Sequence, residues 1–249
     1  MQRKFIVISI IAVLVLGITT ATVIALKNDS NTVETKAEVS TLKTYSYITE
    51  EMLENTQSLE TDLCLVEEYE PNKLQKDADA IVIATVVSID KATANEGLFG
   101  MTKGKLVVKN SLYGKLKEGQ VVEYAKNGGI FSMSEWEKTQ PDAANQKRAY
   151  LRKQAGVEMD LDNTYISVEL SDDVEISEGT TYLMYLKKYQ DSYEIIGLDV
   201  GLREVDMPKV NEVTTQKIET TDLKIKNNKT GEFESLENYI KTYITSSNE

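Results

Sequence analysis

The sequence contains no histidine, and this absence limits the chemistry that the chain can perform. Histidine is the most common general base near neutral pH, and it activates the nucleophile in many serine and cysteine hydrolases. It is also the usual nitrogen ligand of zinc, copper and non-haem iron. The sequence therefore excludes Ser-His and Cys-His nucleophilic systems and histidine-ligated metal centres.

Cysteine and basic residues are also scarce. Because Cys64 is the single cysteine, the chain cannot form an intramolecular disulfide, which excludes a small disulfide-stabilised scaffold. The chain carries 28 lysine and arginine residues against 40 aspartate and glutamate residues, a net charge of −12. We expect such a surface to repel nucleic acids and anionic lipid headgroups, which proteins bind mainly through lysine and arginine. Nucleic acid is therefore excluded as a partner.

One long run without charge is present, at residues 5–26, directly after Arg3 and Lys4. As a helix, these 22 residues would span roughly 33 Å, which is enough to cross the core of a bilayer. The positive-inside rule places the two basic residues in the cytoplasm. We therefore predict a single-pass protein of the cell membrane whose C-terminal domain lies outside. The run is either a retained signal anchor or a signal peptide cleaved after Ala25, which would give a secreted protein.

The remaining chain divides by composition. Residues 27–46 are rich in Thr, Ser, Asn and charge without apolar periodicity, so we predict a polar stalk. The later patterns predict a short helical lead-in at 47–78, a β domain at 79–206 with inserted helices at 133–155, and a C-terminal extension at 207–249.

Apolar periodicity and turn residues predict the individual elements. Strands are expected at 79–90, 105–112, 120–126, 164–170, 180–189, 193–200, 213–218 and 222–226. Helices are expected at 49–60, 71–76 and, as an amphipathic helix, 235–246, and Pro141 should divide residues 133–155 into two helices. The packing positions expected there are Met133, Trp136, Ala143, Ala144, Tyr150 and Leu151. The strand at 79–90 is apolar on both faces, which indicates a central strand.

Three segments occur in an order that is similar to a known pattern. These are ADAIVIATVVSID, LVVKNSLYGKLKEGQVVEYAKNGG and EGTTYLMYLKK, within about residues 74–200. They resemble the OB-like β-barrel ectodomain of uncharacterised exported proteins of Gram-positive bacteria, and the chain departs from that pattern at Ala84, Tyr113 and Tyr185. The resemblance implies a mainly β fold with flanking helices, built as a small OB-like barrel behind one N-terminal transmembrane helix.

The same barrel is distantly similar to netrin and metalloproteinase-inhibitor modules. Those modules depend on an N-terminal cysteine and on disulfides, which this chain lacks, so protease inhibition does not carry over. The matching positions are strand and turn residues, and none of them implies a catalytic role or a cofactor.

Two acidic clusters are the candidates for a metal site, since calcium prefers carboxylate oxygens. The first contains Asp160 and Asp162, and the second contains Asp172 and Asp173. Counted from Asp160, an EF-type loop would need glycine where Tyr165 stands, so solvated acidic loops are the favoured interpretation. Residues 127–129 (Asn-Gly-Gly) lack the lysine of a phosphate-binding loop and predict a turn that ends a strand.

Tyrosine is abundant, and four of the thirteen tyrosines fall in one predicted hairpin: Tyr182, Tyr185, Tyr189 and Tyr193. Tyrosine suits both binding surfaces and strand packing, and the pattern leaves both roles open.

The function predicted from these features is a non-enzymatic, membrane-tethered binding or interaction module. Its partner would be an extracytoplasmic protein or a component of the cell envelope. Two alternatives remain: a cell-envelope enzyme that uses carboxylates, and an adhesion domain stabilised by calcium.

Overall fold

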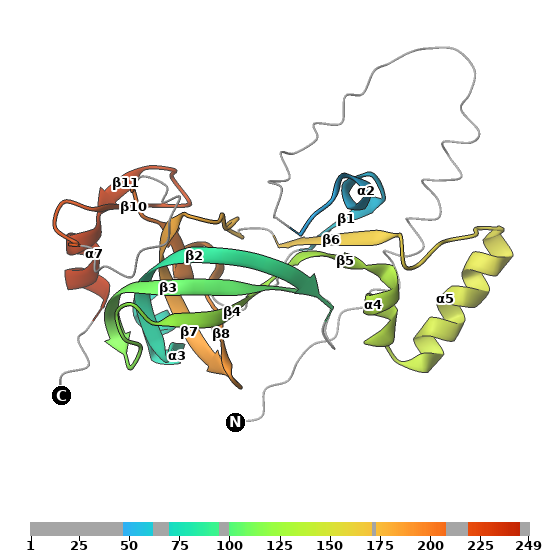
Figure 1. The fold of residues 1–249 in the computed structure, drawn as a ribbon, viewed down its shortest axis with the longest axis horizontal. Helices are drawn as coiled ribbons and strands as arrows, with labels where there is room; N and C mark the ends of the chain where they lie inside the picture. Colours follow the sequence, from blue (N-terminus) through green and yellow to red (C-terminus); the bar gives the residue numbers. More distant parts are fainter. Residues whose placement is uncertain (1–46, 62–69, 95–99, 171–172, 208–218, 245–249) are drawn as a thin grey trace, which may run out of the picture. The chain divides into compact units, whose positions relative to one another are not determined.

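The computed structural model describes residues 47–61, 70–94, 100–170, 173–207 and 219–244 (Figure 1). Of these residues, 42% lie in strands and 26% in helices, so the fold is mainly β with flanking helices, as predicted. Within these ranges, no helix is both long and apolar enough to span a bilayer. The predicted membrane segment 5–26, the stalk 27–46 and the strand 213–218 lie outside the described residues.

The chain forms two compact units. The described part of the smaller unit is residues 146–158. The larger unit contains the other described residues, and we call it the β body.

Five strands of the β body form a closed cycle of pairings. They are β2 (Ala80–Thr93), β3 (Met101–Gly114), β4 (Val121–Asn127), β7 (Thr181–Tyr189) and β8 (Ser192–Ile195). β2 pairs with β3, β3 with β4, β4 with β8, β8 with β7, and β7 again with β2. The β4–β8 pair is parallel, and the other four pairs are antiparallel. We call these five strands the ring.

The ring explains why its central strand is apolar on both faces. Successive side chains of a strand point to opposite faces. In β2, Val82 and Ala84 belong to the inner core of the ring, whereas Ile81 and Ile83 belong to a second core on its outer face. All four side chains are fully buried, which confirms the central position predicted for this strand.

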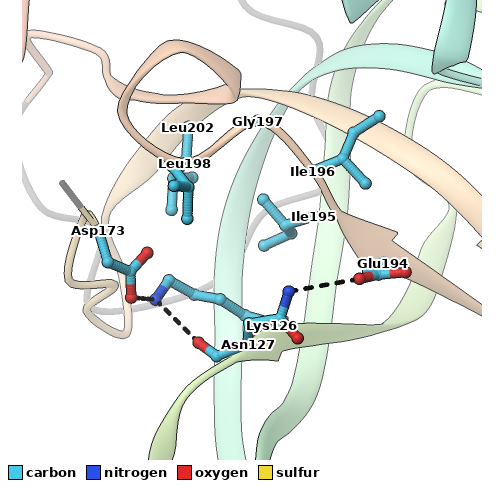
Figure 2. A pocket seen from close by; sticks show the side chains of 9 residues that line it. All are labelled: Lys126, Asn127, Asp173, Glu194, Ile195, Ile196, Gly197, Leu198 and Leu202. Atoms are coloured by element: carbon cyan, nitrogen blue, oxygen red, sulfur yellow. Dashed lines mark hydrogen bonds and ion pairs between the residues drawn. The ribbon is translucent and has the colours of Figure 1, made fainter. Parts of the chain in front are cut away.

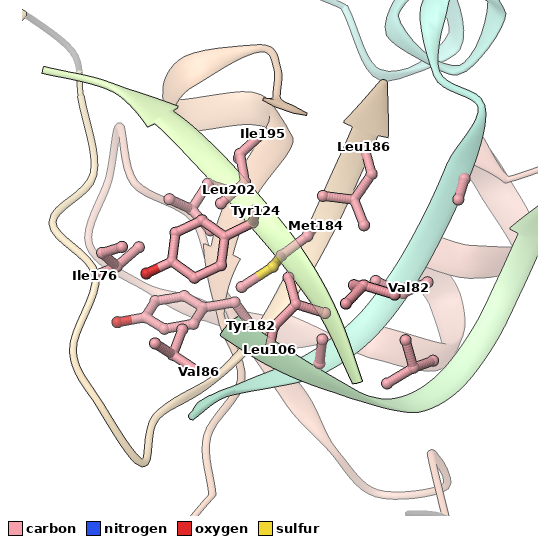
Figure 3. Close-up of a cluster of buried hydrophobic side chains, with 14 of the residues drawn as sticks. Val82, Val86, Leu106, Tyr124, Ile176, Tyr182, Met184, Leu186, Ile195 and Leu202 are labelled. Atoms are coloured by element: carbon pink, nitrogen blue, oxygen red, sulfur yellow. The ribbon is translucent and has the colours of Figure 1, made fainter. Parts of the chain in front are cut away.

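The inner core gathers the side chains that point into the ring. Figure 3 shows Tyr124, Tyr182 and Met184 pointing into the space that β2, β4 and β7 surround. The backbones of β2 and β3 approach closely at Gly104, where an added Cβ would lie 2.0 Å from the Ser88 carbonyl oxygen. A glycine is therefore required at that position.

The C-terminal extension covers the outer face of the ring. It contains β10 (Lys224–Lys226), β11 (Phe233–Ser235) and α7 (Leu236–Tyr243), which is the predicted C-terminal helix in shorter form. The short strand β9 (Leu202–Glu204), which pairs with β7, presents Arg203 to this extension. The Arg203 guanidinium lies 4.6 Å from the ring centroid of Tyr239, donates from Nε to the Lys226 carbonyl at 2.8 Å and forms an ion pair with Glu234. One buried cation thus joins the extension to the edge of the sheet.

A second sheet has the strand order β1–β6–β5, where β1 is Thr56–Thr61, β6 is Tyr165–Leu170 and β5 is Gly129–Ser132. Five further helices complete the described fold: α2 (Glu50–Glu54), α3 (Pro71–Asp77), α4 (Met133–Lys138), α5 (Asp142–Ala155) and α6 (Leu198–Gly201). The division between α4 and α5 at Pro141 confirms the prediction of two helices in this region.

Three of the predicted elements are wrong in part. The helix expected at 49–60 ends at Glu54, because Asn55 caps it and residues 56–61 instead pair in parallel with β6. The strand expected at 193–200 ends at Ile195, because the backbone turns at Gly197 and Leu198, whose φ angles are 88° and 45°. The Asn-Gly-Gly turn does end β4, but the chain resumes at once as β5.

The packing positions predicted in the two helices are confirmed only for the first. Met133 and Trp136 of α4 are buried, with 5% and 8% of their surface exposed. In α5, by contrast, no residue is buried, and Tyr150 is 60% exposed. Helical spacing alone therefore did not identify a packed face in α5.

The tyrosines of the predicted hairpin differ in burial. Tyr182 and Tyr185 are packing residues, with 2% and 0% exposed, whereas Tyr189 is 57% exposed. Burial raises the pKa of Tyr182 to about 12, although the Ser177 amide, which donates to its hydroxyl at 3.0 Å, acts in the opposite direction. Burial also raises the pKa of Tyr185 and of Tyr239, whose hydroxyls lie 3.3 Å apart.

These pKa values predict that the fold loses stability at high pH. A tyrosine in the unfolded chain releases its proton near pH 10, before the buried tyrosines do, so above this pH the unfolded state binds fewer protons. The contribution of these buried tyrosines to the free energy of unfolding is complete below pH 10 and is lost as pH rises toward 12. The free energy of unfolding should fall by about 1.4 kcal/mol per pH unit for each such tyrosine. Urea unfolding between about pH 9 and pH 12, with tyrosinate absorbance as a second probe, measures this slope.

At neutral pH, Tyr182→Phe should lower the free energy of unfolding by roughly 1 kcal/mol, because the hydrogen bonds of the hydroxyl are missing. Between about pH 10 and pH 12, the free energy of unfolding of this variant should fall less steeply with pH, by the contribution of about one proton. Tyr189→Phe is the matched control, because it removes the hydroxyl of a side chain that is 57% exposed. An unchanged slope for Tyr182→Phe would contradict the burial argument.

Candidate functional site

A cavity of about 80 Å³ lies where β4 ends, beside β8 and the turn that follows it (Figure 2). Four polar residues line it: Lys126 and Asn127 at the end of β4, Asp173 before β7, and Glu194 of β8. The apolar lining includes Ile195, Leu198 and Leu202. We call this cavity the β4–β8 pocket.

The parallel pairing of β4 with β8 assembles the pocket. Tyr124 is in register with Tyr193, and Ala125 with Glu194, so the end of β4 lies directly beside Glu194. These residues are about 70 positions apart in the sequence and meet only because the ring closes. The pocket is therefore a product of the ring rather than of a local motif.

The turn after β8 supplies part of the apolar lining. Gly197 has a φ of 88°, and a Cβ at this position would lie 2.2 Å from a Leu74 methyl carbon, so only glycine fits. Leu198 follows with a φ of 45°, a left-handed conformation that costs a non-glycine residue roughly 1–2 kcal/mol. Strained residues of this kind are often found at functional sites. Leu198 and Leu202 lie together on one side of the pocket (Figure 2).

The polar side of the pocket is a connected set of charged and amide groups. Lys126 forms an ion pair with Asp173, and their side chains are only 10% and 19% exposed. The Lys126 ammonium also donates to the Asn127 carbonyl at 3.5 Å, while the Asn127 amide donates to a Glu194 carboxylate oxygen at 3.4 Å. Lys126 balances Asp173, and Glu194 accepts from the Asn127 amide, so these four groups carry a net charge of −1.

The lining offers two carboxylates and one ammonium group as its ionisable side chains. None of the nine lining residues is a serine, threonine, cysteine or tyrosine, so the pocket contains no hydroxyl or thiol nucleophile. It does contain two carboxylates, but Asp173 is held by Lys126 and Glu194 by Asn127. Its volume is also far below the roughly 300–1,000 Å³ of typical sites for small-molecule substrates and cofactors.

The residues predicted as metal candidates lie in different settings. Asp160 caps its own loop: its carboxylate accepts from the backbone of Asp162 and Asn163 at 3.2 and 3.3 Å, and from the Asn163 side chain at 2.8 Å. These hydrogen bonds, that of the Asn163 side chain foremost, lower the pKa of Asp160. Asp162 is exposed, Asp173 is part of the β4–β8 pocket, and Asp172 lies outside the described residues.

Among the residues that the structure describes, no group of three or more histidine, cysteine, aspartate or glutamate side chains is arranged to hold a metal ion. Calcium binding by the acidic clusters therefore stays a prediction from the sequence.

Sequence reasoning did not identify most of the pocket. It considered Asp173 as a metal candidate and the glycines after Asn127 as a turn, but Lys126, Glu194 and Leu198 carry no recognisable motif. The available signal was Lys126 itself, a charged residue that directly follows Tyr124 and Ala125 near the end of a predicted strand. Comparisons of the chain with protein-family models, with curated proteins and with solved structures returned no match.

Proposed function

We propose that this chain is an extracytoplasmic, membrane-tethered binding module without catalytic activity, built on an OB-like β-barrel. The closed cycle of five pairings supports the barrel, because closing a small sheet removes its unpaired edges and encloses one set of side chains. The order of the strand, turn and glycine motifs in the sequence supports the same interpretation. Residues 5–26 supply the tether if they are retained, and a secreted module results if the chain is cleaved after Ala25.

The β4–β8 pocket is the proposed point of contact with the partner. The observation that carries this proposal is the combination of an apolar lining with a polar side that is negatively charged in total. A cavity of about 80 Å³ suits one inserted side chain rather than a whole small molecule. We infer that the partner is an extracytoplasmic protein, or an envelope component with an equivalent group, that inserts a lysine or arginine side chain.

The shape of such a side chain matches the two sides of the pocket. Lysine and arginine have an apolar stem, which would lie against Leu198 and Leu202, and a cationic head, which would point toward Glu194. A hydrogen bond between a cation and a carboxylate is about twice as strong as a neutral one. The acidic surface of the chain would also attract a basic partner before contact.

A carboxylate-dependent enzyme remains the second candidate, because Asp173 and Glu194 line one pocket. The engagement of both carboxylates and the small volume favour binding. Hydrolysis of a cell-envelope substrate that is abolished by Asp173→Asn or by Glu194→Gln would establish the enzyme instead.

The pocket can be tested with n-propylguanidine as a probe for an arginine side chain. We expect this cation to shift the methyl NMR signals of Ile195, Leu198 and Leu202 in a saturable manner, while butyrate, an anion of similar size, leaves them unchanged. Glu194→Gln should weaken binding of the cation roughly tenfold, which corresponds to the loss of one charge-assisted hydrogen bond.

The matched control for this test is Glu123→Gln. Glu123 is an exposed carboxylate of β4 that does not line the pocket, so this variant loses the same charge while retaining the site. Binding of butyrate in preference to the cation, or equal weakening by both variants, would contradict the proposed specificity.

The proposed location is tested by fractionating a Gram-positive host that expresses the full chain, with the intact mass of the product. Retention predicts a full-length species in the membrane fraction whose domain is removed from whole cells by external protease. Cleavage predicts a species that begins at Leu26 in the medium. A full-length chain in the cytoplasm, protected from external protease, would contradict both forms of the proposal.

A further inference from the structure

The β4–β8 pocket brings an amine and a carboxylate into direct contact. Lys126, near the end of β4, reaches Asp173, which lies 47 positions later in the sequence. Figure 2 shows the end of the Lys126 side chain pointing at the carboxylate. A lysine amine is a nucleophile and the carbon of a carboxyl group is an electrophile, so the contact places two groups that can form an amide bond next to each other.

This contact is more shielded from water than an ion pair on the surface. The side chains of Lys126 and Asp173 are 10% and 19% exposed, whereas those of Lys241 and Glu237 in α7 are 68% and 49% exposed. Water stabilises separated charges, and the burial of an ion pair removes most of this stabilisation. Burial therefore favours a reaction that removes both charges.

The strands hold both reacting groups in place. Lys126 is paired in register with Thr102 of β3, so its backbone position is fixed by the ring. The Asp173 amide donates to the Leu170 carbonyl at 3.1 Å, directly after β6. Groups that are held in a suitable geometry react as if their concentrations were very high. The fold therefore supplies the proximity that a free amine and a free carboxylic acid lack in solution.

We propose that Lys126 and Asp173 are joined by an isopeptide bond between Lys126 Nζ and Asp173 Cγ. One proton passes from the ammonium to the carboxylate, which gives a neutral amine and a neutral carboxylic acid. The amine nitrogen then attacks Cγ, and the bond from Cγ to the hydroxyl oxygen breaks. The hydroxyl leaves as water with a second proton from the nitrogen, so one ammonium and one carboxylate become one amide and one water. The reaction needs no oxidant, reductant or further co-reactant.

The pocket has room for this reaction and keeps its charge afterwards. Its cavity of about 80 Å³ is lined by both residues and can hold the released water, which occupies about 30 Å³ in the liquid. The bond removes one positive and one negative charge, so the net charge of −1 that Glu194 contributes does not change. The cross-link is therefore compatible with the proposed binding of a cation and does not depend on it.

An isopeptide bond gives the chain a covalent constraint that its cysteine content does not allow. Cys64 is the single cysteine, so no disulfide can connect two distant segments of one chain. The bond joins β4 to the segment between β6 and β7 and closes the chain between positions that are 47 residues apart. Closing a loop of this kind stabilises a fold by limiting the freedom of the unfolded chain.

The intact mass of the folded full chain is the direct test. Formation of the bond releases one water, so we expect a mass about 18 Da below the value calculated from the sequence. The calculated value starts at Met1 for a retained N-terminal segment and at Leu26 for a cleaved one, so the result does not depend on the proposed tether. Tryptic digestion should also yield a branched peptide that joins residues 118–138 to residues 154–187, because trypsin does not cleave after an acylated lysine.

Two variants and one matched control locate the bond. Lys126→Arg keeps the positive charge but replaces the amine with a guanidinium, which stays protonated, so this variant should have its full calculated mass. Asp173→Ala removes the carboxyl group and should also have its full calculated mass. Lys241→Arg makes the same change in the exposed ion pair with Glu237, and it should retain both the loss of about 18 Da and the branched peptide.

A full calculated mass for the folded wild-type chain, without the branched peptide, would overturn the proposal and leave an ordinary ion pair. Loss of water that persists in both Lys126→Arg and Asp173→Ala would overturn it as well, because cyclisation of another aspartate onto its own backbone releases the same mass. Binding of n-propylguanidine is a separate result that depends on Glu194. Its failure would refute the proposed role of the pocket and leave the cross-link unaffected.

Discussion

The pairing of β2 with both β3 and β7 is the constraint on which the rest of the β body depends. It places β2 between two neighbours and buries side chains on both of its faces, so one strand contributes to the inner core and to the outer core. The inner core requires the closed ring, and the outer core requires the C-terminal extension, which Arg203 joins to the sheet. A polar substitution in the centre of β2 would therefore disturb the inner core at Val82 or Ala84 and the outer core at Ile81 or Ile83.

The same closure provides the candidate site. The β4–β8 pocket exists because closing the ring brings β8 parallel to β4, and the left-handed turn at Gly197 and Leu198 then completes its apolar side.

The sequence predicted most elements of the ring, because β2, β3, β4 and β7 have β-branched and apolar patterns that reflect burial on the ring. It did not predict β1, since residues 56–61 are polar and become a strand only by pairing with β6, more than 100 residues away. It also could not locate the pocket: the neighbours of Lys126 come from β8 and from Asp173, and long-range register is not encoded in any local motif. In α5 the spacing of Tyr150 and Leu151 suggested a packed face, but neither side chain is buried in the fold.

The most direct test of this account is whether β2 and β7 lie side by side at Thr85 and Thr181, which are paired in register with hydroxyls 2.8 Å apart. In the Cys64→Ser background, Thr85→Cys with Thr181→Cys should form an intramolecular disulfide during oxidative refolding, because paired strand positions lie within disulfide range. Thr85→Cys with Lys187→Cys should not, since Lys187 is about 20 Å farther along β7. Failure of the first pair to cross-link, or equal cross-linking of both pairs, would contradict the closed ring.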